Sequence, residues 1–187
     1  MDWFLQNHSL ISVLYFIVIA IVAHLLTPSE YDWKRNSISE LGAQQYENKW
    51  VMQIGLGGFG LILTIGGIFR LLGLGPTWFV EVPVLVYAGS LILTGIFCTK
   101  PFVQSEDYSK REDKLHSVFA NLTGISFSAA VAVQSMVSEE FIGFALNILV
   151  LAATLLLVFS FGRSESKRGI FQRVTFIVGF LWLIFLY

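Results

Sequence analysis

The sequence has little charge and almost no cysteine. Only 13% of its 187 residues are charged, whereas soluble proteins average about 25%. The net charge of -1 gives no reason to expect a nucleic-acid partner. Cys98 is the single cysteine, which excludes an intramolecular disulfide and a cysteine metal cluster. We therefore expect no cofactor and no metal. The low charge also indicates that water is not the only solvent around this protein.

Long apolar runs take the place of charge. A bilayer core about 30 Å thick is crossed by about 17 to 25 apolar residues in a helix. Six stretches qualify: 10–26, 50–72, 82–98, 115–137, 141–162 and 170–187. They predict an all-α fold, a single membrane domain over 1–187 with six transmembrane helices, because open sheets leave backbone groups unpaired in lipid. The first stretch lacks a basic flank and a cleavage site, so we expect an uncleaved anchor.

The basic residues predict an orientation. Six spans place both termini on one side, and eleven of the twelve Lys and Arg residues then fall in three connections on the opposite side. These eleven are Lys34, Arg35, Lys49, Lys100, Lys110, Arg111, Lys114, Arg163, Lys167, Arg168 and Arg173. By the positive-inside rule the three connections are cytoplasmic and the termini extracytoplasmic, in a prokaryotic cytoplasmic membrane. Arg70 is the exception.

The first connection contains an unusually polar segment, YDWKRNSISELG, at residues 31–42. Ser37 and Glu40 have the S-x-x-E spacing of a capping box, and Gly42 is expected to end the turn in a left-handed conformation. A short interfacial helix that turns the chain back into the membrane explains these three residues. It does not explain Asn36 or Ser39, and long ordered loops are often binding elements. Both interpretations stay open.

Small and polar residues form stripes on two spans. GLGGFG at residues 55–60 fits a dinucleotide-binding spacing, but that motif needs a preceding strand, so we interpret it as a packing surface. The stripe on span two is Gln53, Gly57, Gly60, Thr64 and Gly67. The stripe on span four is Ser117, Asn121, Gly124, Ser128 and Ser135. We expect the two helices to approach closely, which would give Gln53 or Asn121 a partner.

The histidines offer weak indications of chemistry. His24 and His116 fall on the predicted cytoplasmic side, and Asp113 precedes His116 by one helical turn. A metal or haem held by the two histidines is an alternative, but the sequence lacks H-x-x-H and H-E-x-x-H. The sequence also lacks the G-x-S-x-G nucleophile motif. No catalytic residue can be assigned.

Several short motifs together carry a family resemblance. A tyrosine before NSISELG is followed by Asn48, a glycine-rich second span, GIF at the end of the third span and KLH at the start of the fourth. This order resembles the bacterial and archaeal membrane family catalogued as domain of unknown function 998. Where that family usually has Pro and Asp after GIF, this chain has Cys98, Thr99, Lys100 and Pro101.

A second, more distant resemblance concerns the loop alone. SISELG before span two is similar to the corresponding loop of six-span DRAM-type proteins, some of which are tied to lipid-anchor remodelling or phospholipid distribution. Those proteins are drawn with the loop on the non-cytoplasmic side, whereas the charges here predict the cytoplasmic side.

The sequence supports one leading hypothesis for function. A polar site facing the cytoplasm would bind a lipid headgroup or another small amphiphile, with membrane lipids as partners. Its expected residues are Asn36, Ser37, Ser39, Glu40, Asp113 and His116.

Three alternatives stay open. One is a transporter or oligomeric pore, although no span carries a central acid, base or proline. Another is an intramembrane lipid-modifying enzyme with Glu40 or His116 as general base. The third is an auxiliary subunit of a membrane complex. Besides lipids, the partner to expect is a second copy of the chain or another membrane protein.

Overall fold

The computed structural model describes residues 2–73, 78–103 and 105–187, and within these ranges the chain is helical with no strand. Six long α-helices and one short 3₁₀-helix form there. They are α1 (Asp2–Leu25), η1 (Ile38–Gly42), α2 (Lys49–Leu72), α3 (Trp78–Ile96), α4 (Lys110–Val137), α5 (Phe141–Arg163) and α6 (Arg168–Phe185). All six α-helices are long and apolar enough to cross a membrane, which confirms the predicted six-helix fold.

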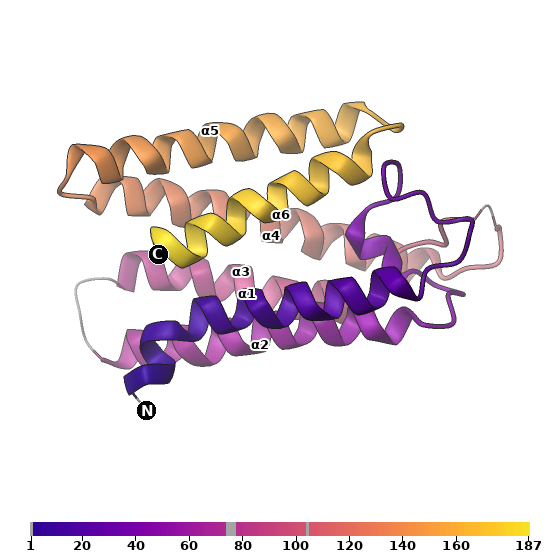
Figure 1. Cartoon of the computed structure of the whole chain (residues 1–187), viewed down its shortest axis with the longest axis horizontal. Helices are drawn as coiled ribbons and strands as arrows, with labels where there is room; N and C mark the ends of the chain where they lie inside the picture. Colours follow the sequence, from indigo (N-terminus) through magenta and orange to yellow (C-terminus); the bar gives the residue numbers. More distant parts are fainter. Residues whose placement is uncertain (1, 74–77, 104) are drawn as a thin grey trace.

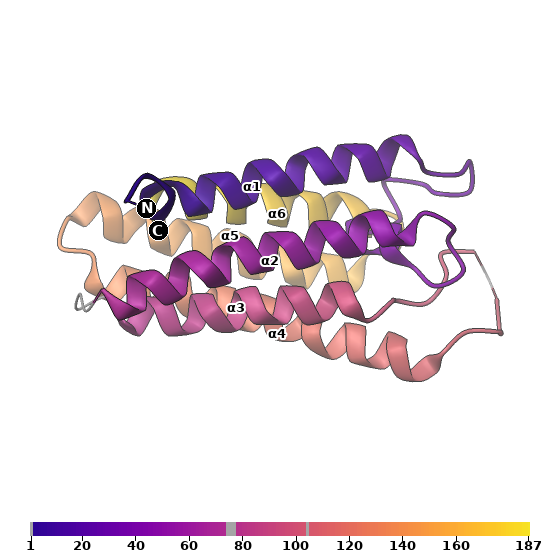
Figure 2. The ribbon, with the colours of Figure 1, turned by 90° about the horizontal axis from the view of Figure 1, so that it is seen from below.

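The helices form one antiparallel bundle in which neighbours in the chain are also neighbours in space. Each helix packs against the next, and α6 returns to touch α1. The helix axes run side by side, and α1 begins where α6 ends (Figures 1 and 2). The first loop, which connects α1 to α2 and contains η1, and the second loop, which connects α3 to α4, lie together at the opposite end. We call this second end the polar-loop end.

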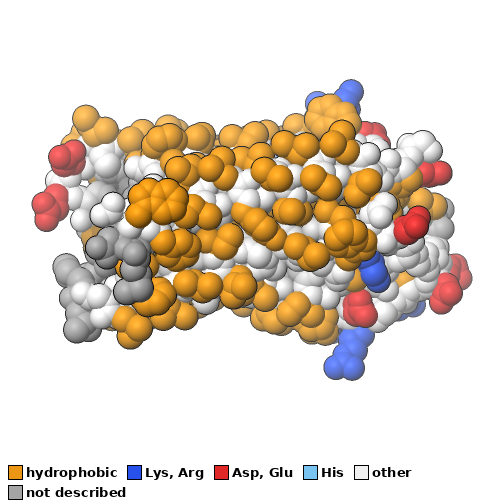
Figure 3. Space-filling view, turned by 60° about the horizontal axis from the view of Figure 1, so that its bottom comes forward, with side chains coloured by type: hydrophobic (Ala, Val, Ile, Leu, Met, Phe, Trp, Pro, Cys, Tyr) orange, Lys and Arg blue, Asp and Glu red, His pale blue; other side chains and the backbone are white. Residues whose placement is uncertain are grey.

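The molecular surface divides into an apolar middle and charged ends. Figure 3 shows hydrophobic side chains covering the central part of the visible face, with acidic side chains at one end and both acidic and basic side chains at the other. α5 is the most exposed of the spans, with Asn147 and Thr154 as its buried residues. This pattern is that of helices whose outer faces contact lipid rather than water.

Among the helices, α1 and α4 begin furthest ahead of the apolar runs that predicted them. α1 starts at Asp2, eight residues before the predicted span. Polar side chains of this added stretch bond within the helix: Asn7 Nδ2 donates to the Trp3 carbonyl at 2.8 Å, and His8 Nδ1 lies 2.8 Å from the Leu5 carbonyl oxygen. α4 starts at Lys110, where the side chain of Ser109 accepts a hydrogen bond from the Glu112 amide. Capping and local hydrogen bonds extend both helices beyond their apolar stretches.

A chain of aromatic contacts crosses the bundle core. Phe16 of α1 packs on Phe59 of α2 with ring centroids 5.4 Å apart, and Phe59 meets Tyr87 of α3 at 6.3 Å. Tyr87 then contacts Phe127 of α4 at 5.5 Å, and Phe127 contacts Trp182 of α6 at 5.3 Å. Such ring pairs add about 0.5–1.5 kcal/mol each beyond the contribution of buried area. Because the contacts run from α1 through α2, α3 and α4 to α6, these five helices share one core.

The polar stripe of α2 packs on α3 rather than on α4. A Cβ added at Gly60 would lie 2.5 Å from the Ala88 carbonyl oxygen, and one at Gly67 would lie 2.9 Å from Leu85. Gln53 Nε2 donates to the sulfur of Cys98 at 3.3 Å. Thr64 bonds within α2 to the Gly60 carbonyl.

The predicted direct packing of spans two and four is therefore wrong, because α3 packs against both helices. On α4, Asn121 is exposed and a Cβ at Gly124 would meet nothing within 4 Å. A Cβ at Gly57 of α2 would also meet nothing within 4 Å. Small residues on a helix face do not identify the neighbour.

The exceptional basic residue has a buried partner. Arg70 Nε lies 2.8 Å from Glu81 Oε1, and the Glu81 side chain is fully buried. The Tyr187 hydroxyl donates to the same carboxylate, while Arg70 donates to the Tyr187 carbonyl and lies over its ring. Arg70 thus joins α2, α3 and the end of α6 near the chain termini. Removing one partner of such a pair leaves a buried unmatched charge.

Candidate functional site

The first long loop begins with a tight turn built by its own side chains. Asp32 Oδ1 accepts a hydrogen bond from the Lys34 amide at 2.9 Å. The Asn36 amide donates to the Asp32 carbonyl at 2.6 Å, and Asn36 Oδ1 accepts from the Asp32 amide at 3.0 Å. Asp and Asn favour such turns because their short side chains bond nearby backbone groups. Asn36, unexplained by the sequence, closes this turn.

The capping box is confirmed at the start of η1. Glu40 Oε2 accepts hydrogen bonds from the Ser37 amide at 2.5 Å and from the Ser37 hydroxyl at 2.8 Å. Asn36 Nδ2 donates to Glu40 Oε1 at 3.4 Å, and Ser39 Oγ lies 3.2 Å from Ser37 Oγ. Four of the six predicted site residues therefore lie together.

The expected left-handed end of the turn at Gly42 is wrong. Among the described glycines none has a positive φ, and the 3₁₀-helix ends in extended backbone at Ala43. The only positive φ of a described non-glycine residue is that of Gln45, at 63°. Gln45 is a short way further along the same loop, so the sharp change of direction occurs there. A non-glycine residue in this region is uncommon and is often found at functional sites.

The first turn and a half of α6 holds this loop in place. Arg168 lies 3.2 Å from Glu40 Oε1. Gln172 Oε1 accepts from the Ile38 amide at 2.6 Å, and Arg173 donates to the Trp33 and Asn36 carbonyls at 2.7 and 3.0 Å. A Cβ at Gly169 would collide with two carbonyl oxygens of the loop. The loop is therefore part of the folded bundle.

We call Arg168, Gly169, Gln172 and Arg173 the α6 clamp. Tyr31 connects this clamp to the second loop. Its hydroxyl donates to the Ser37 carbonyl at 2.8 Å and accepts from Arg173 at 2.8 Å. Burial raises the pKa of Tyr31 to about 12, although the Arg173 guanidinium acts in the opposite direction. The hydroxyl therefore stays protonated at neutral pH. The ring packs edge-on against Phe102 with centroids 5.7 Å apart.

Asp113 and His116 have a different role from the Glu40 cluster. His116 is buried, and its Nδ1 lies 3.1 and 2.9 Å from the carbonyl oxygens of Thr94 and Phe97 at the end of α3. Asp113 Oδ1 accepts from the Thr99 hydroxyl at 3.1 Å and the Lys100 amide at 2.8 Å. These two residues hold the end of α3 and the start of the second loop.

The predicted six-residue site thus consists of two separate hydrogen-bonded groups. Glu40 has Arg168, Ser37 and Asn36 as partners, whereas the bonds of His116 go to α3. His24 of α1 contacts the Tyr31 ring edge-on, so His24 and His116 also have separate partners. In the part of the chain that the structure describes, no group of three or more possible metal ligands occurs.

Gln44 joins the two loops and was not predicted. Its backbone amide donates to the Thr99 carbonyl at 2.9 Å, and its side-chain Nε2 donates to the carbonyls of Cys98 and Ser109 at 3.2 and 3.0 Å. Its Oε1 accepts from the Ser109 amide at 2.7 Å. One buried carboxamide thus ties the first loop to both ends of the second. A buried polar side chain that bonds this fully fixes a unique loop arrangement.

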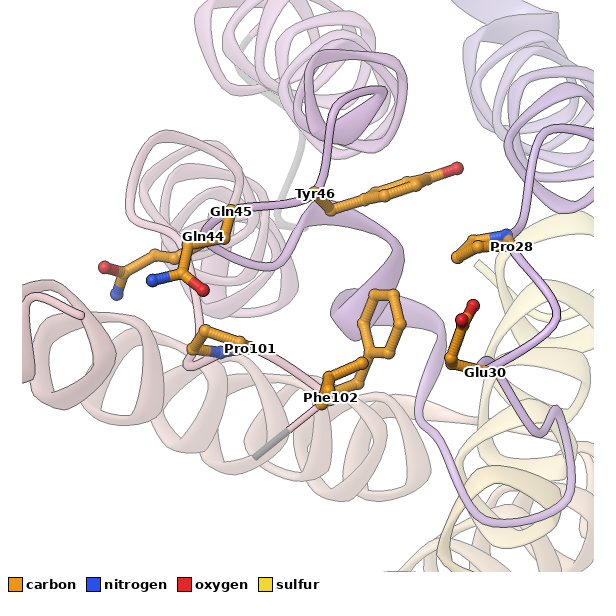
Figure 4. A pocket seen from close by; sticks show the side chains of 8 residues that line it. Pro28, Glu30, Gln44, Gln45, Tyr46, Pro101 and Phe102 are labelled. Carbon is orange, nitrogen blue, oxygen red and sulfur yellow. The ribbon is translucent and has the colours of Figure 1, made fainter. Parts of the chain in front are cut away.

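A pocket of about 210 Å³ lies between the two joined loops. It is lined by Pro28, Glu30, Gln44, Gln45, Tyr46, Pro101, Phe102 and Val103. Figure 4 shows the Tyr46 and Phe102 rings between the Glu30 carboxylate on one side and the two glutamines with Pro101 on the other. We call this the loop pocket. None of the six predicted site residues lines it.

A second hollow, of about 340 Å³, lies between the end of α3 and the start of α4, where Phe97, Arg111 and Glu112 are among its lining residues. It is lined by two neighbouring segments only, whereas the loop pocket is lined by three stretches from the two long loops.

One signal in the sequence could have found the α6 clamp. Arg168 and Gln172, like Gly169 and Arg173, are spaced by four residues, so all four share one face at the start of the last helix. A glycine between polar residues on that face indicates close backbone approach. The loop pocket has no comparable signal, because its residues come from three separate stretches and none forms a motif.

These features define the class of protein as a polytopic helical membrane protein with a structured polar-loop end. Over residues 10–187 the chain matches the family described as Protein of unknown function (DUF998), and it belongs to that family. This confirms the first resemblance seen in the sequence. Neither a curated protein nor a solved structure matches the chain.

Proposed function

We propose that the protein binds the headgroup of a membrane lipid or of a similar amphiphile in the loop pocket. The observation that carries this proposal is the position of the pocket just beyond the ends of α1, α2 and α3. The 24 residues of α2 span about 36 Å, which is longer than the apolar core of a bilayer, about 30 Å. A pocket at the end of such a helix lies at headgroup depth.

The size and lining of the pocket also support a headgroup as its ligand. A volume of about 210 Å³ is below the 300–1,000 Å³ or so typical of pockets for drug-sized molecules. It is enough for a small polar group whose acyl chains stay in the membrane. Aromatic and proline residues make up half of the lining residues, and Glu30 with the two glutamines provides polar groups for orientation.

The six residues predicted from the sequence support the pocket in this proposal and do not touch the ligand. Glu40 and its neighbours fix the first loop against α6, and Asp113 with His116 fixes the start of the second. The bound group would be held by the lining residues within 28–30, 44–46 and 101–103. The predicted cytoplasmic orientation would place it in the inner leaflet.

Filling the pocket tests this function. Val103 lines the pocket and is 51% exposed, so Val103→Trp should occupy the cavity without disturbing the core. The matched control is Val118→Trp, because Val118 is 50% exposed on α4, away from the pocket. We expect native mass spectrometry in mild detergent to show loss of about one bound lipid per chain for the first variant only. Equal lipid retention in both variants would overturn the proposal.

A further inference from the structure

We propose that the loop pocket is selective for an ammonium group, so that its ligand is an amine-bearing amphiphile. This inference rests on the proposed function and adds the chemical class of the headgroup. Three features of the pocket carry it: its charge, its pair of aromatic rings and the fixed position of those rings.

The charge of the pocket comes from Glu30. Its carboxylate is the only formally charged group among the lining residues, and the hydrogen bond that it accepts comes from Ser29 Oγ at 3.2 Å. In the described ranges the ion pairs are Arg70 with Glu81 and Arg168 with Glu40, so Glu30 has no basic partner there. An unpaired carboxylate attracts a cation and repels a purely anionic headgroup.

The two rings provide a second attraction for the same charge. Tyr46 and Phe102 lie beside Glu30 around one opening in Figure 4, with ring centroids 5.8 Å apart and planes inclined by 67°. The face of an aromatic ring attracts a cation within about 6 Å, and groups of rings bind quaternary ammonium ligands in this way. A carboxylate beside aromatic rings therefore favours an ammonium ion over a phosphate or a neutral sugar.

The rings are held before any ligand binds. The Tyr46 hydroxyl donates to the Leu26 carbonyl at 2.7 Å. Phe102 packs edge-on against Tyr31, which the Arg173 guanidinium holds. A pocket whose side chains are already in place loses less entropy on binding. The clamp on α6 therefore acts on the pocket through Tyr31 and Phe102, which makes Arg173 a positioning residue.

The experiment compares headgroups on identical acyl chains. The full chain in detergent is titrated with dioleoyl phosphatidylethanolamine, phosphatidylcholine or phosphatidylglycerol, and the bound fraction is read by native mass spectrometry. We expect the two amine lipids to bind at least fivefold more tightly than phosphatidylglycerol. Glu30→Gln should reduce that preference to less than twofold. The matched control is Glu47→Gln, since Glu47 is exposed on the same loop but does not line the pocket, and it should keep the preference.

The outcomes separate this inference from the proposed function. Equal binding of all three lipids, or a preference that survives Glu30→Gln, overturns ammonium selectivity even if Val103→Trp abolishes binding. Retention of all lipids by Val103→Trp overturns the proposed function itself. Addition of soluble ethanolamine distinguishes two sources of the ammonium group: displacement of the amine lipid shows that the free amine suffices, and failure to displace it assigns the site to intact lipid.

Discussion

At Glu40 the two carboxylate oxygens divide their contacts between the loop and α6. Oε2 completes the local capping box with Ser37, and Oε1 meets Arg168 across 128 residues of sequence. The Glu40 side chain is only 6% exposed, whereas that of Arg168 is 32% exposed. The buried carboxylate therefore depends on a cation that water still reaches, and screening reduces the strength of the pair.

A double-mutant cycle measures this pair. Glu40→Gln keeps the box, because Gln also completes it, but it loses the ion pair with Arg168 and the long hydrogen bond from Asn36 Nδ2 to Oε1. We expect Glu40→Gln and Arg168→Ala to be coupled by about 1 kcal/mol in thermal or denaturant unfolding in detergent. Glu40→Gln and His116→Ala should be additive within about 0.5 kcal/mol, because their hydrogen bonds belong to separate groups. Arg163→Ala, at the exposed end of α5, is the matched control for the arginine.

The reverse pattern, namely additivity with Arg168 and coupling with His116, would contradict the assigned contacts.

The positions of these residues in the sequence explain why only half of the Glu40 contacts could be predicted. Ser37 and Glu40 are three positions apart, so a local rule identifies their bond. Arg168 is brought to Glu40 only by the closure of the bundle, and no rule based on local spacing predicts that contact.

At the scale of the helices, α3 is the central element of the first four. It packs against α2 on one side and α4 on the other. Gly95 on α3 makes this contact close, since a Cβ there would lie 3.0 Å from the Gln53 carbonyl oxygen. The apolar runs predicted the six spans because crossing a membrane requires length and composition alone. They could not predict the neighbours, because small residues suit any helix that comes close.

Two glycines on α2 provide a matched comparison. Gly60→Ala should lower the melting temperature in detergent, at a cost of about 1–3 kcal/mol, because the new methyl group meets the Ala88 carbonyl of α3. Gly57→Ala should be neutral or slightly stabilising, because nothing lies within 4 Å of that position and Ala is the better helix former. Equal effects of the two substitutions would contradict the close contact of Gly60 with α3 and the open space beside Gly57.

At the scale of the whole molecule, the two ends of the bundle differ in construction. The end with the termini holds Arg70 in a buried cluster with Glu81 and Tyr187. The polar-loop end contains the other eleven basic residues, two long loops and the loop pocket. The positive-inside rule therefore predicts that the polar-loop end is cytoplasmic, and the one exception to the count is a residue with a structural partner.

Thiol labelling in intact cells of an expression host checks this orientation. In a Cys98→Ala background, Glu139→Cys should react with an impermeant reagent, because Glu139 is exposed beside the end with the termini. Ser166→Cys, exposed between α5 and α6, should react only after the cells are permeabilised. Labelling of Ser166→Cys alone in intact cells would invert the orientation and place the loop pocket in the outer leaflet.

The most direct measurement of the central claim, that a lipid headgroup occupies the loop pocket, is photocrosslinking with a phospholipid that carries a photoactivatable group at its headgroup. The full chain is irradiated in lipid bilayers and the modified peptides are identified by mass spectrometry. We predict crosslinks within residues 28–30, 44–46 and 101–103, and their loss in Val103→Trp but not in Val118→Trp. Crosslinks confined to the exposed face of α5, or to the hollow beside Arg111 and Glu112, with none in the two loops, would contradict the account.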